Sequence, residues 1–153
     1  MNLIIRKAKI DDIDILNNLF QKLLEYEREN YDDNIKDNLN ITSYFNERIN
    51  ANDNIVLVAQ LDNEIVGYIY SIIDSDNKVT KNIEAKIDSL YVNSEYRNKN
   101  IGTKLIEEMI TILKEKNVKY IFIENLKEND TAKYLYEKLG FKIFREDRRK
   151  ELI

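Results

Sequence analysis

The chain has 153 residues, of which 43% are hydrophobic and 34% are charged, a length and mixture typical of one globular domain. It contains no cysteine and no histidine, which excludes disulfides, zinc sites, thiolate nucleophiles and serine–histidine triads. A formal net charge of −4 argues against general nucleic-acid binding, because that function normally needs a basic face.

Residues 1–153 are therefore expected to form a single domain with no metal, nucleic-acid or membrane partner. No apolar run reaches the roughly eighteen residues that a membrane span requires. The first residues carry too short an apolar stretch for a signal peptide, and no cleavage site follows them. We therefore expect a cytoplasmic protein.

The first half of the chain predicts one strand, two helices and a strand meander. Residues 3–9 alternate as a strand, and a helix capped by Asp11 or Asp12 runs to about Glu29. A shorter helix carrying Phe45 follows it. Three β-branched and aromatic runs then predict strands, the first two joined as a hairpin, over residues 54–61, 65–73 and 83–92.

The second half returns to helical spacing. Apolar residues recur every three or four positions from Ile101, which predicts a helix ending near Asn117. Residues 119–125 form a strand pattern, and the next helix stops at Gly140, a favourable left-handed C-cap. A last strand is expected from Phe141. The predicted order is β-α-α-β-β-β-α-β-α-β, an α/β (α+β) fold around a largely antiparallel sheet.

The most informative segment, residues 90–105, runs from a strand through a basic turn into a helix. The unpaired N–H groups and partial positive charge of a helix start suit an anion such as pyrophosphate. Gly102 allows phosphates to approach closely, and Asn100 tolerates a left-handed backbone. A solvated loop with an Asn turn fits the same pattern, so the segment alone leaves the function open.

This turn resembles the pyrophosphate loop of the GNAT superfamily of N-acetyltransferases. That loop follows the pattern Arg/Gln-x-x-Gly-x-Gly/Ala after a strand and at the head of a long helix. Arg97, Asn100 and Gly102 occupy the three defined positions. Asn100 replaces the first glycine of the pattern.

A second motif near the C-terminus strengthens the resemblance. The last helix of that family commonly reads Asn-x-x-Ala-x-x-Leu/Phe-Tyr-x-Lys-x-Gly-Phe. The two motifs stand in the expected order, and the resemblance implies the GNAT fold, a mixed sheet of six to seven strands flanked by four helices. The residues that fill the second pattern are Asn129, Ala132, Leu135, Tyr136, Lys138, Gly140 and Phe141.

The resemblance implies an acyltransferase that uses acetyl-CoA as co-substrate. The pantetheine arm would bond to the strand end at Leu90 and Val92, where this strand splays from residues 119–125. The loop would hold the pyrophosphate. The implied cofactor-binding residues are Leu90, Tyr91, Val92, Arg97, Asn98, Lys99, Asn100, Ile101, Gly102, Thr103, Asn129 and Lys133.

The resemblance also implies direct attack of an amine on the thioester through a tetrahedral intermediate. Within the motif, Tyr136 would protonate the departing thiolate, whereas its spacing alone favours an aromatic residue of a buried helix face. The acceptor ammonium must first lose a proton. Glu84 and Asp88 share one face of their strand and are the candidate bases, although strand carboxylates of this kind are also common as exposed pairing residues.

An acidic segment between the first two helices suggests the acceptor. Its negative charge would attract a small cationic amine such as a polyamine or aminosugar, although a solvated helix end explains it too. A protein or peptide amine is the alternative acceptor, and a non-catalytic acyl-CoA-binding regulatory module is the alternative function. A homodimer is also expected. The acidic residues are Glu25, Glu27, Glu29, Asp32, Asp33 and Asp37.

Overall fold

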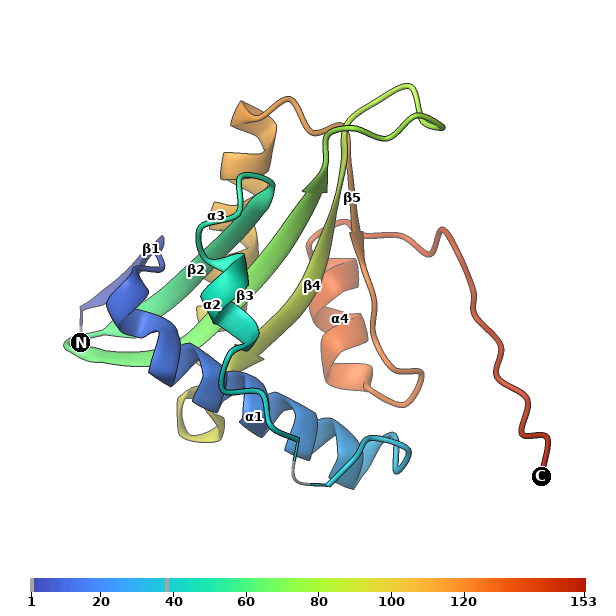
Figure 1. The fold of residues 1–153 in the computed structure, drawn as a ribbon, viewed down its shortest axis with the longest axis horizontal. Coiled ribbons are helices and arrows are strands. Elements are labelled where there is room, and N and C mark those ends of the chain that lie inside the picture. The colour runs from blue at the N-terminus through green and yellow to red at the C-terminus, as the bar shows by residue number, and fades with distance from the viewer. Residues whose placement is uncertain (1, 38) are drawn as a thin grey trace.

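The structure is a computed structural model that describes residues 2–37 and 39–153. Its centre is a five-stranded sheet with the order β1-β2-β3-β4-β5 (Figure 1). Strands β1 to β4 are antiparallel to their neighbours, whereas β5 is parallel to β4. The strands are β1 (Leu3–Lys7), β2 (Asn54–Leu61), β3 (Glu64–Asp74), β4 (Glu84–Val92) and β5 (Tyr120–Ile123).

Four α-helices flank this sheet in the described residues, which confirms the predicted number. Short 3-10 turns precede the first helix, at Ile10–Asp12, and follow β4, at Ser94–Tyr96. Within residues 2–37 and 39–153 no helix is long and apolar enough to cross a membrane. The helices are α1 (Ile13–Asn30), α2 (Tyr44–Arg48), α3 (Ile101–Glu115) and α4 (Asp130–Lys138).

The sheet is covered on both faces because β3 sends alternate large side chains to opposite sides (Figure 1). Tyr68 and Tyr70 pack under α1 and α2, together with the fully buried Phe45 of α2. Ile69 faces the other way, under α3, and Val66 joins it because a bulge at Val66, opposite Ala59 and Gln60, breaks the alternation. The residues of α3 that are buried there recur at helical spacing, as the sequence predicts: Ile101, Leu105, Ile106, Met109 and Leu113.

An ion pair joins β1 to the start of α1. The guanidinium of Arg6 donates to both carboxylate oxygens of Asp12, at 2.7 and 3.0 Å, and the Lys9 backbone N–H also donates to Asp12, at 2.7 Å. These donors hold the pKa of the buried Asp12 carboxyl below its ordinary value, the Arg6 hydrogen bond being the largest cause. The pair therefore stabilises the folded state when Asp12 is ionised.

We expect Asp12→Asn to lower the free energy of unfolding by about 1–3 kcal/mol at pH 7. A lowered folded pKa contributes stability that is full above the unfolded value of about 3.9 and is lost as the pH falls through the folded value. The difference from wild type should therefore shrink below about pH 3. Urea unfolding at both pH values measures it, with the exposed Asp11→Asn as control. An equal difference at both pH values would contradict the role of the charge.

The C-terminal half of β4 separates from β5. Pairing between the two strands runs only from Glu84 opposite Tyr120 to Ile87 opposite Ile123. Toward β3, Tyr70 lies opposite Ser89 and Ser71 opposite Ile87, so Asp88 is the extra residue of a β-bulge. Bulges bend a strand and re-aim its side chains. Within the part of the chain that the structure describes, residues 88–92 therefore form an edge that is free on the β5 side, as the predicted splay requires.

The strand predicted from Phe141 is wrong, because residues 141–153 form neither helix nor strand. The described sheet consequently has five strands instead of six to seven. Phe144 packs on Phe122 of β5, with ring centroids 5.5 Å apart. All seven residues from 145 to 151 are charged, which leaves few apolar side chains to anchor a further strand. The other predicted elements are confirmed to within a few residues at each end.

Candidate active site

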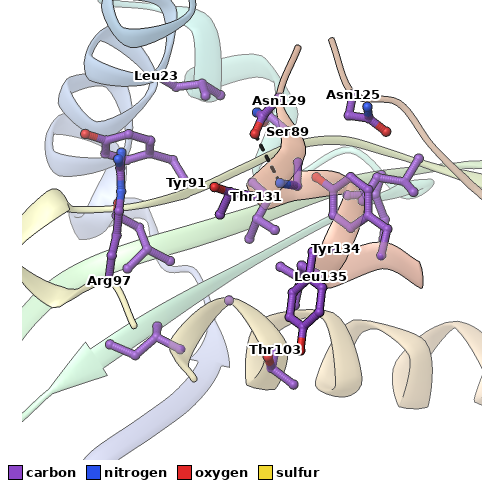
Figure 2. A pocket seen from close by; sticks show the side chains of 18 of the residues that line it. Leu23, Ser89, Tyr91, Arg97, Thr103, Asn125, Asn129, Thr131, Tyr134 and Leu135 are labelled. Carbon is purple, nitrogen blue, oxygen red and sulfur yellow. Dashed lines mark hydrogen bonds between the residues drawn. The ribbon is translucent and has the colours of Figure 1, made fainter. Parts of the chain in front are cut away.

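A pocket of about 490 Å³ opens where β4 leaves β5. Side chains from α1, β4, the turn after it, α3 and the α4 region surround it (Figure 2). Leu23 comes from α1, Ser89 and Tyr91 from β4, and Thr103 from α3. The lining elements come from both sides of the sheet, α1 from one side and α3 from the other.

One end of the pocket is built by the start of α3. Asn100 is the N-cap and has a left-handed backbone with φ 59°, as its sequence position predicts, and its side chain makes no capping hydrogen bond. The first N–H groups of α3 are thus not satisfied by an Asn100 side-chain cap. A helix start of this kind attracts an anion. Gly102 lies on the pocket side of this turn.

Arg97 supplies positive charge beside this helix start. Its Nε donates to the carbonyl oxygen of Val92 at 3.1 Å, which ties the turn to the end of β4. Its guanidinium lies over the ring of Tyr26 at 4.6 Å and that of Tyr91 at 5.5 Å. These cation–π contacts hold the side chain at the pocket wall, so its charge is fixed before any ligand arrives.

The opposite wall is α4, whose start is capped by Asn129. Its Oδ1 accepts from the Ala132 backbone N–H at 3.1 Å, drawn as the dashed line in Figure 2. Two turns later Tyr136 lines the pocket. Burial, and to a smaller degree the charge of Glu27, raise the pKa of Tyr136 to about 12. The helix ends before Gly140, which has φ 86°, the left-handed conformation predicted for this C-cap.

Three carboxylates, considered as possible bases, differ in their position relative to the pocket. Asp88 lines it and accepts a hydrogen bond from the Tyr44 hydroxyl of α2 at 3.1 Å. Glu84, at the far end of β4, pairs with Tyr120 and is not among the described residues that line the pocket. Glu27 of α1 lines it and is half-buried, and desolvation raises the pKa of its carboxyl, with a smaller contribution from Asp32.

Most residues expected at the site do come together. Of the expected cofactor-binding residues, only Lys99 and Lys133 lie outside the described lining. Lys99 packs on the ring of Tyr96 at 5.2 Å, and Lys133 pairs with Asp130 at 3.0 Å. Tyr136 lines the pocket, on the helix that the second motif predicts.

The sequence argument missed Glu27 as a pocket residue and counted it only within the acidic segment. A signal was present, because Glu27 follows Leu23 by four residues and both therefore lie on one face of α1. Ser89 was also missed. Its place depends on the bulge at Asp88, which strand alternation does not predict.

Comparison with known proteins identifies the family. A sequence model described as the acetyltransferase (GNAT) family matches residues 16–141. Two curated relatives named N-alpha-acetyltransferase align over 144 residues, which is 90% of this chain and 79% of each relative. That of Sulfurisphaera tokodaii is 31% identical and that of Saccharolobus solfataricus 33% identical.

Solved structures share the fold. A predicted acetyltransferase from Clostridium acetobutylicum, solved with acetyl-CoA, superposes with a TM-score of 0.78 at 22% identity, over 98% of this chain and 96% of that one. An aminoglycoside acetyltransferase from an uncultured soil sample, solved with sisomicin, gives 0.74 at 23% identity, over 99% and 95%.

The sheet with its splayed β4 and the helices around it define an α/β protein of the acetyltransferase fold. The chain belongs to the acetyltransferase (GNAT) family and is an N-acetyltransferase that acts on amines.

Proposed function

We propose that the pocket binds acetyl-CoA as the acetyl donor, with its pantetheine arm along the free edge of β4 and its pyrophosphate at the start of α3. The supporting observation is that a strand edge without a partner on the β5 side leads directly to an open helix start beside Arg97. Both features offer backbone groups to a ligand. The structure solved with acetyl-CoA and superposed above is consistent with this donor.

Gly102 provides a test of the phosphate position. A methyl group at Gly102 would come no closer than 3.6 Å to Leu135, an ordinary contact, so Gly102→Ala should preserve the fold and raise the free energy of unfolding by up to about 1 kcal/mol. It would occupy space that the phosphates need. We expect acetyl-CoA affinity, measured by calorimetry, to fall about tenfold. Unchanged affinity would contradict the assignment of this turn.

In the proposed reaction a neutral amine attacks the thioester carbonyl and forms the new C–N bond, and the C–S bond then breaks. Tyr136 gives its phenolic proton to the leaving thiolate. With a pKa of about 12 the phenol keeps its proton throughout the neutral range, so the acid is always in the correct form. Backbone N–H groups near the free β4 edge stabilise the oxyanion.

We propose an α-amino group of a peptide or protein as the acceptor. Support comes from the two relatives named N-alpha-acetyltransferase. The acidic segment is a weaker argument for a small polycation than the sequence suggests, because part of its charge is already compensated. Asp32 pairs with Arg149 at 3.0 Å and Asp37 with Arg28 at 3.1 Å.

A small cationic amine, such as a polyamine or aminosugar, is the second candidate. It is favoured by the uncompensated Glu27 in the pocket and by the fold shared with an aminoglycoside acetyltransferase. Mass spectrometry of products formed from acetyl-CoA decides between the two. The panel contains peptides that differ in their first residue, N-blocked peptides with one lysine, spermidine and kanamycin. Acetylation of free peptide N-termini at the highest kcat/KM supports the first candidate, and faster turnover of spermidine or kanamycin would replace it with the second.

We also propose that the chain forms a homodimer through its C-terminal tail, residues 141–153. The tail passes Phe122 of β5, contacts Asp32 through Arg149 and then ends away from the sheet (Figure 1), and its Ile143, Phe144 and Leu152 are largely exposed. Within the described residues β5 is paired only on its β4 side, so its outer edge is available to a tail from a second copy. Light scattering after size exclusion should give a dimer for the full chain and a monomer after deletion of residues 142–153. A monomeric full chain would contradict the proposal.

A further inference from the structure

Glu27 is a carboxylate in the pocket lining to which no role has yet been assigned. It lies in the last turns of α1, half-buried, and faces the pocket across from α4. In the described residues no hydrogen bond or ion pair engages its carboxylate, unlike Asp88, which accepts from Tyr44. After burial, its negative charge is a smaller cause of the raised pKa of the phenols of Tyr136 on α4 and Tyr68 on β3.

Two hydroxyls beside it are also without partners. Ser89 Oγ of β4 and the Tyr68 phenol oxygen are both buried and neither makes a hydrogen bond of good geometry within the described residues, although the Ser89 hydroxyl lies near enough to the Tyr68 phenol to lower its pKa against the larger effect of burial. Ser89 lines the pocket and is 7% exposed. Nearly all buried polar groups in folded proteins are hydrogen-bonded, so two neighbouring hydroxyls in the pocket wall without a hydrogen bond indicate a place for a further polar atom. An ammonium nitrogen or a bridging water matches it.

We propose that Glu27 is the catalytic base that removes a proton from the acceptor ammonium, and that the Ser89 hydroxyl binds the same nitrogen. This inference rests on the proposed acetyl transfer. It assigns the base to α1, in place of the strand carboxylates Glu84 and Asp88. An unpaired carboxylate on a half-buried pocket wall both attracts the ammonium and, having shed part of its hydration, holds the proton more strongly than an exposed carboxylate does.

The proton balance closes with residues on both walls. The ammonium gives one proton to Glu27, which later passes it to solvent. The freed lone pair attacks the acetyl carbonyl carbon, the C–N bond forms and the C–S bond breaks. Tyr136 protonates the departing sulfur and recovers a proton from the new amide nitrogen. Burial is the larger cause of the raised pKa of Tyr136, and neutralising Glu27 removes the smaller contribution of its charge, so proton uptake at the base favours proton release at the acid.

Burial raises the pKa of the Glu27 carboxyl, and the charge of Asp32, which follows α1, raises it further. The other charged groups in the pocket lining are Arg97 of the turn, Asp88 of β4, Glu124 after β5 and Lys138 of α4. Tyr136 and Tyr68 are neutral near pH 7, as any ordinary tyrosine is, and burial raises the pKa of both phenols further. The rise of kcat/KM on the acid side of its pH profile should therefore follow the ionisation of Glu27.

The test is the pH profile of kcat/KM for Glu27→Gln, with acetyl-CoA and a peptide that has a free N-terminus. In the wild type the rate should rise through a value above the ordinary glutamate pKa and level off below pH 7. The variant must take neutral amine from solution, so its rise should move to about pH 8, where α-amino groups titrate. The defect should be tenfold or more at pH 6 and small at pH 9. Glu108→Gln, exposed on α3, is the control for net charge.

The outcomes distinguish a failure of the base assignment from a failure of the proposed acetyl transfer. A Glu27→Gln defect of the same size at every pH, or none, would overturn the base assignment while acetyl transfer stands. A wild type that acetylates no amine would overturn both. Ser89→Ala is the second variant; we expect a three- to tenfold higher KM for the peptide, an unchanged KM for acetyl-CoA and the wild-type pH profile. An unchanged peptide KM would remove Ser89 from the site.

Discussion

Replacing Tyr136 by Phe should lower kcat about 100-fold or more while leaving the fold and the affinity for acetyl-CoA nearly unchanged. General acid catalysis contributes factors of this size, and the thiolate would have to leave without a positioned proton. Only one oxygen is removed, and the ring keeps its contact with Phe141, whose centroid lies 6.1 Å away. Single-turnover and steady-state rates at saturating acetyl-CoA measure the effect.

The raised pKa of Tyr136 also determines the pH range over which the wild-type rate should hold. Because burial raises the pKa to about 12, the phenol remains protonated up to alkaline pH, and loss of the acid should not slow the wild type below about pH 10. Tyr120→Phe, at an exposed position on β5, is the matched control and should keep full activity. A Tyr136→Phe loss of less than threefold would make Tyr136 a packing residue of α4.

Phe45→Ala should produce the largest loss of stability, about 3–5 kcal/mol in the free energy of unfolding. The side chain is fully buried between α2 and the sheet, with its ring 5.4 Å from Tyr68 and 5.9 Å from Tyr70. Truncation leaves a cavity under a helix of only five residues, which has little stability of its own. Urea unfolding followed by far-ultraviolet circular dichroism measures the change.

The same variant should also disturb the site, since α2 carries Tyr44, whose hydroxyl bonds Asp88 at 3.1 Å. Phe45→Leu keeps most of the volume and should lose less than half as much stability. A loss below about 1 kcal/mol for Phe45→Ala would mean that α2 is not held by this aromatic cluster. In that event the position of Asp88 would depend on β4 alone.

Sequence patterns predict most of this fold because the buried faces are regular. The α3 residues from Ile101 to Leu113 follow the helical period, and Asn100 and Gly140 adopt the left-handed conformations that their side chains favour. The prediction of a last strand was wrong for a physical reason. A short apolar start at Phe141 matches a strand pattern, yet strand formation depends on neighbours that can bury it, and the charged residues after it cannot.

The residues of the site likewise fall into those that sequence patterns predict and those that they do not. The cofactor turn and Tyr136 follow from local motifs, whose spacing is visible in one segment of chain. Glu27 and Ser89 come from elements distant in sequence and meet only through packing of α1 against the sheet. The pairing of Arg149 with Asp32, which compensates part of the acidic segment, spans 117 positions and has no local signature.

The most direct test of acetyl transfer is release of CoA from acetyl-CoA, followed with a thiol-reactive dye in the presence of peptides, polyamines, aminosugars and amino acids. The chain has no cysteine, so the protein itself contributes no signal. We predict release that depends on the amine and falls in Tyr136→Phe. Tight binding of acetyl-CoA without release on any amine would contradict the enzymatic account and indicate a non-catalytic acyl-CoA-binding module.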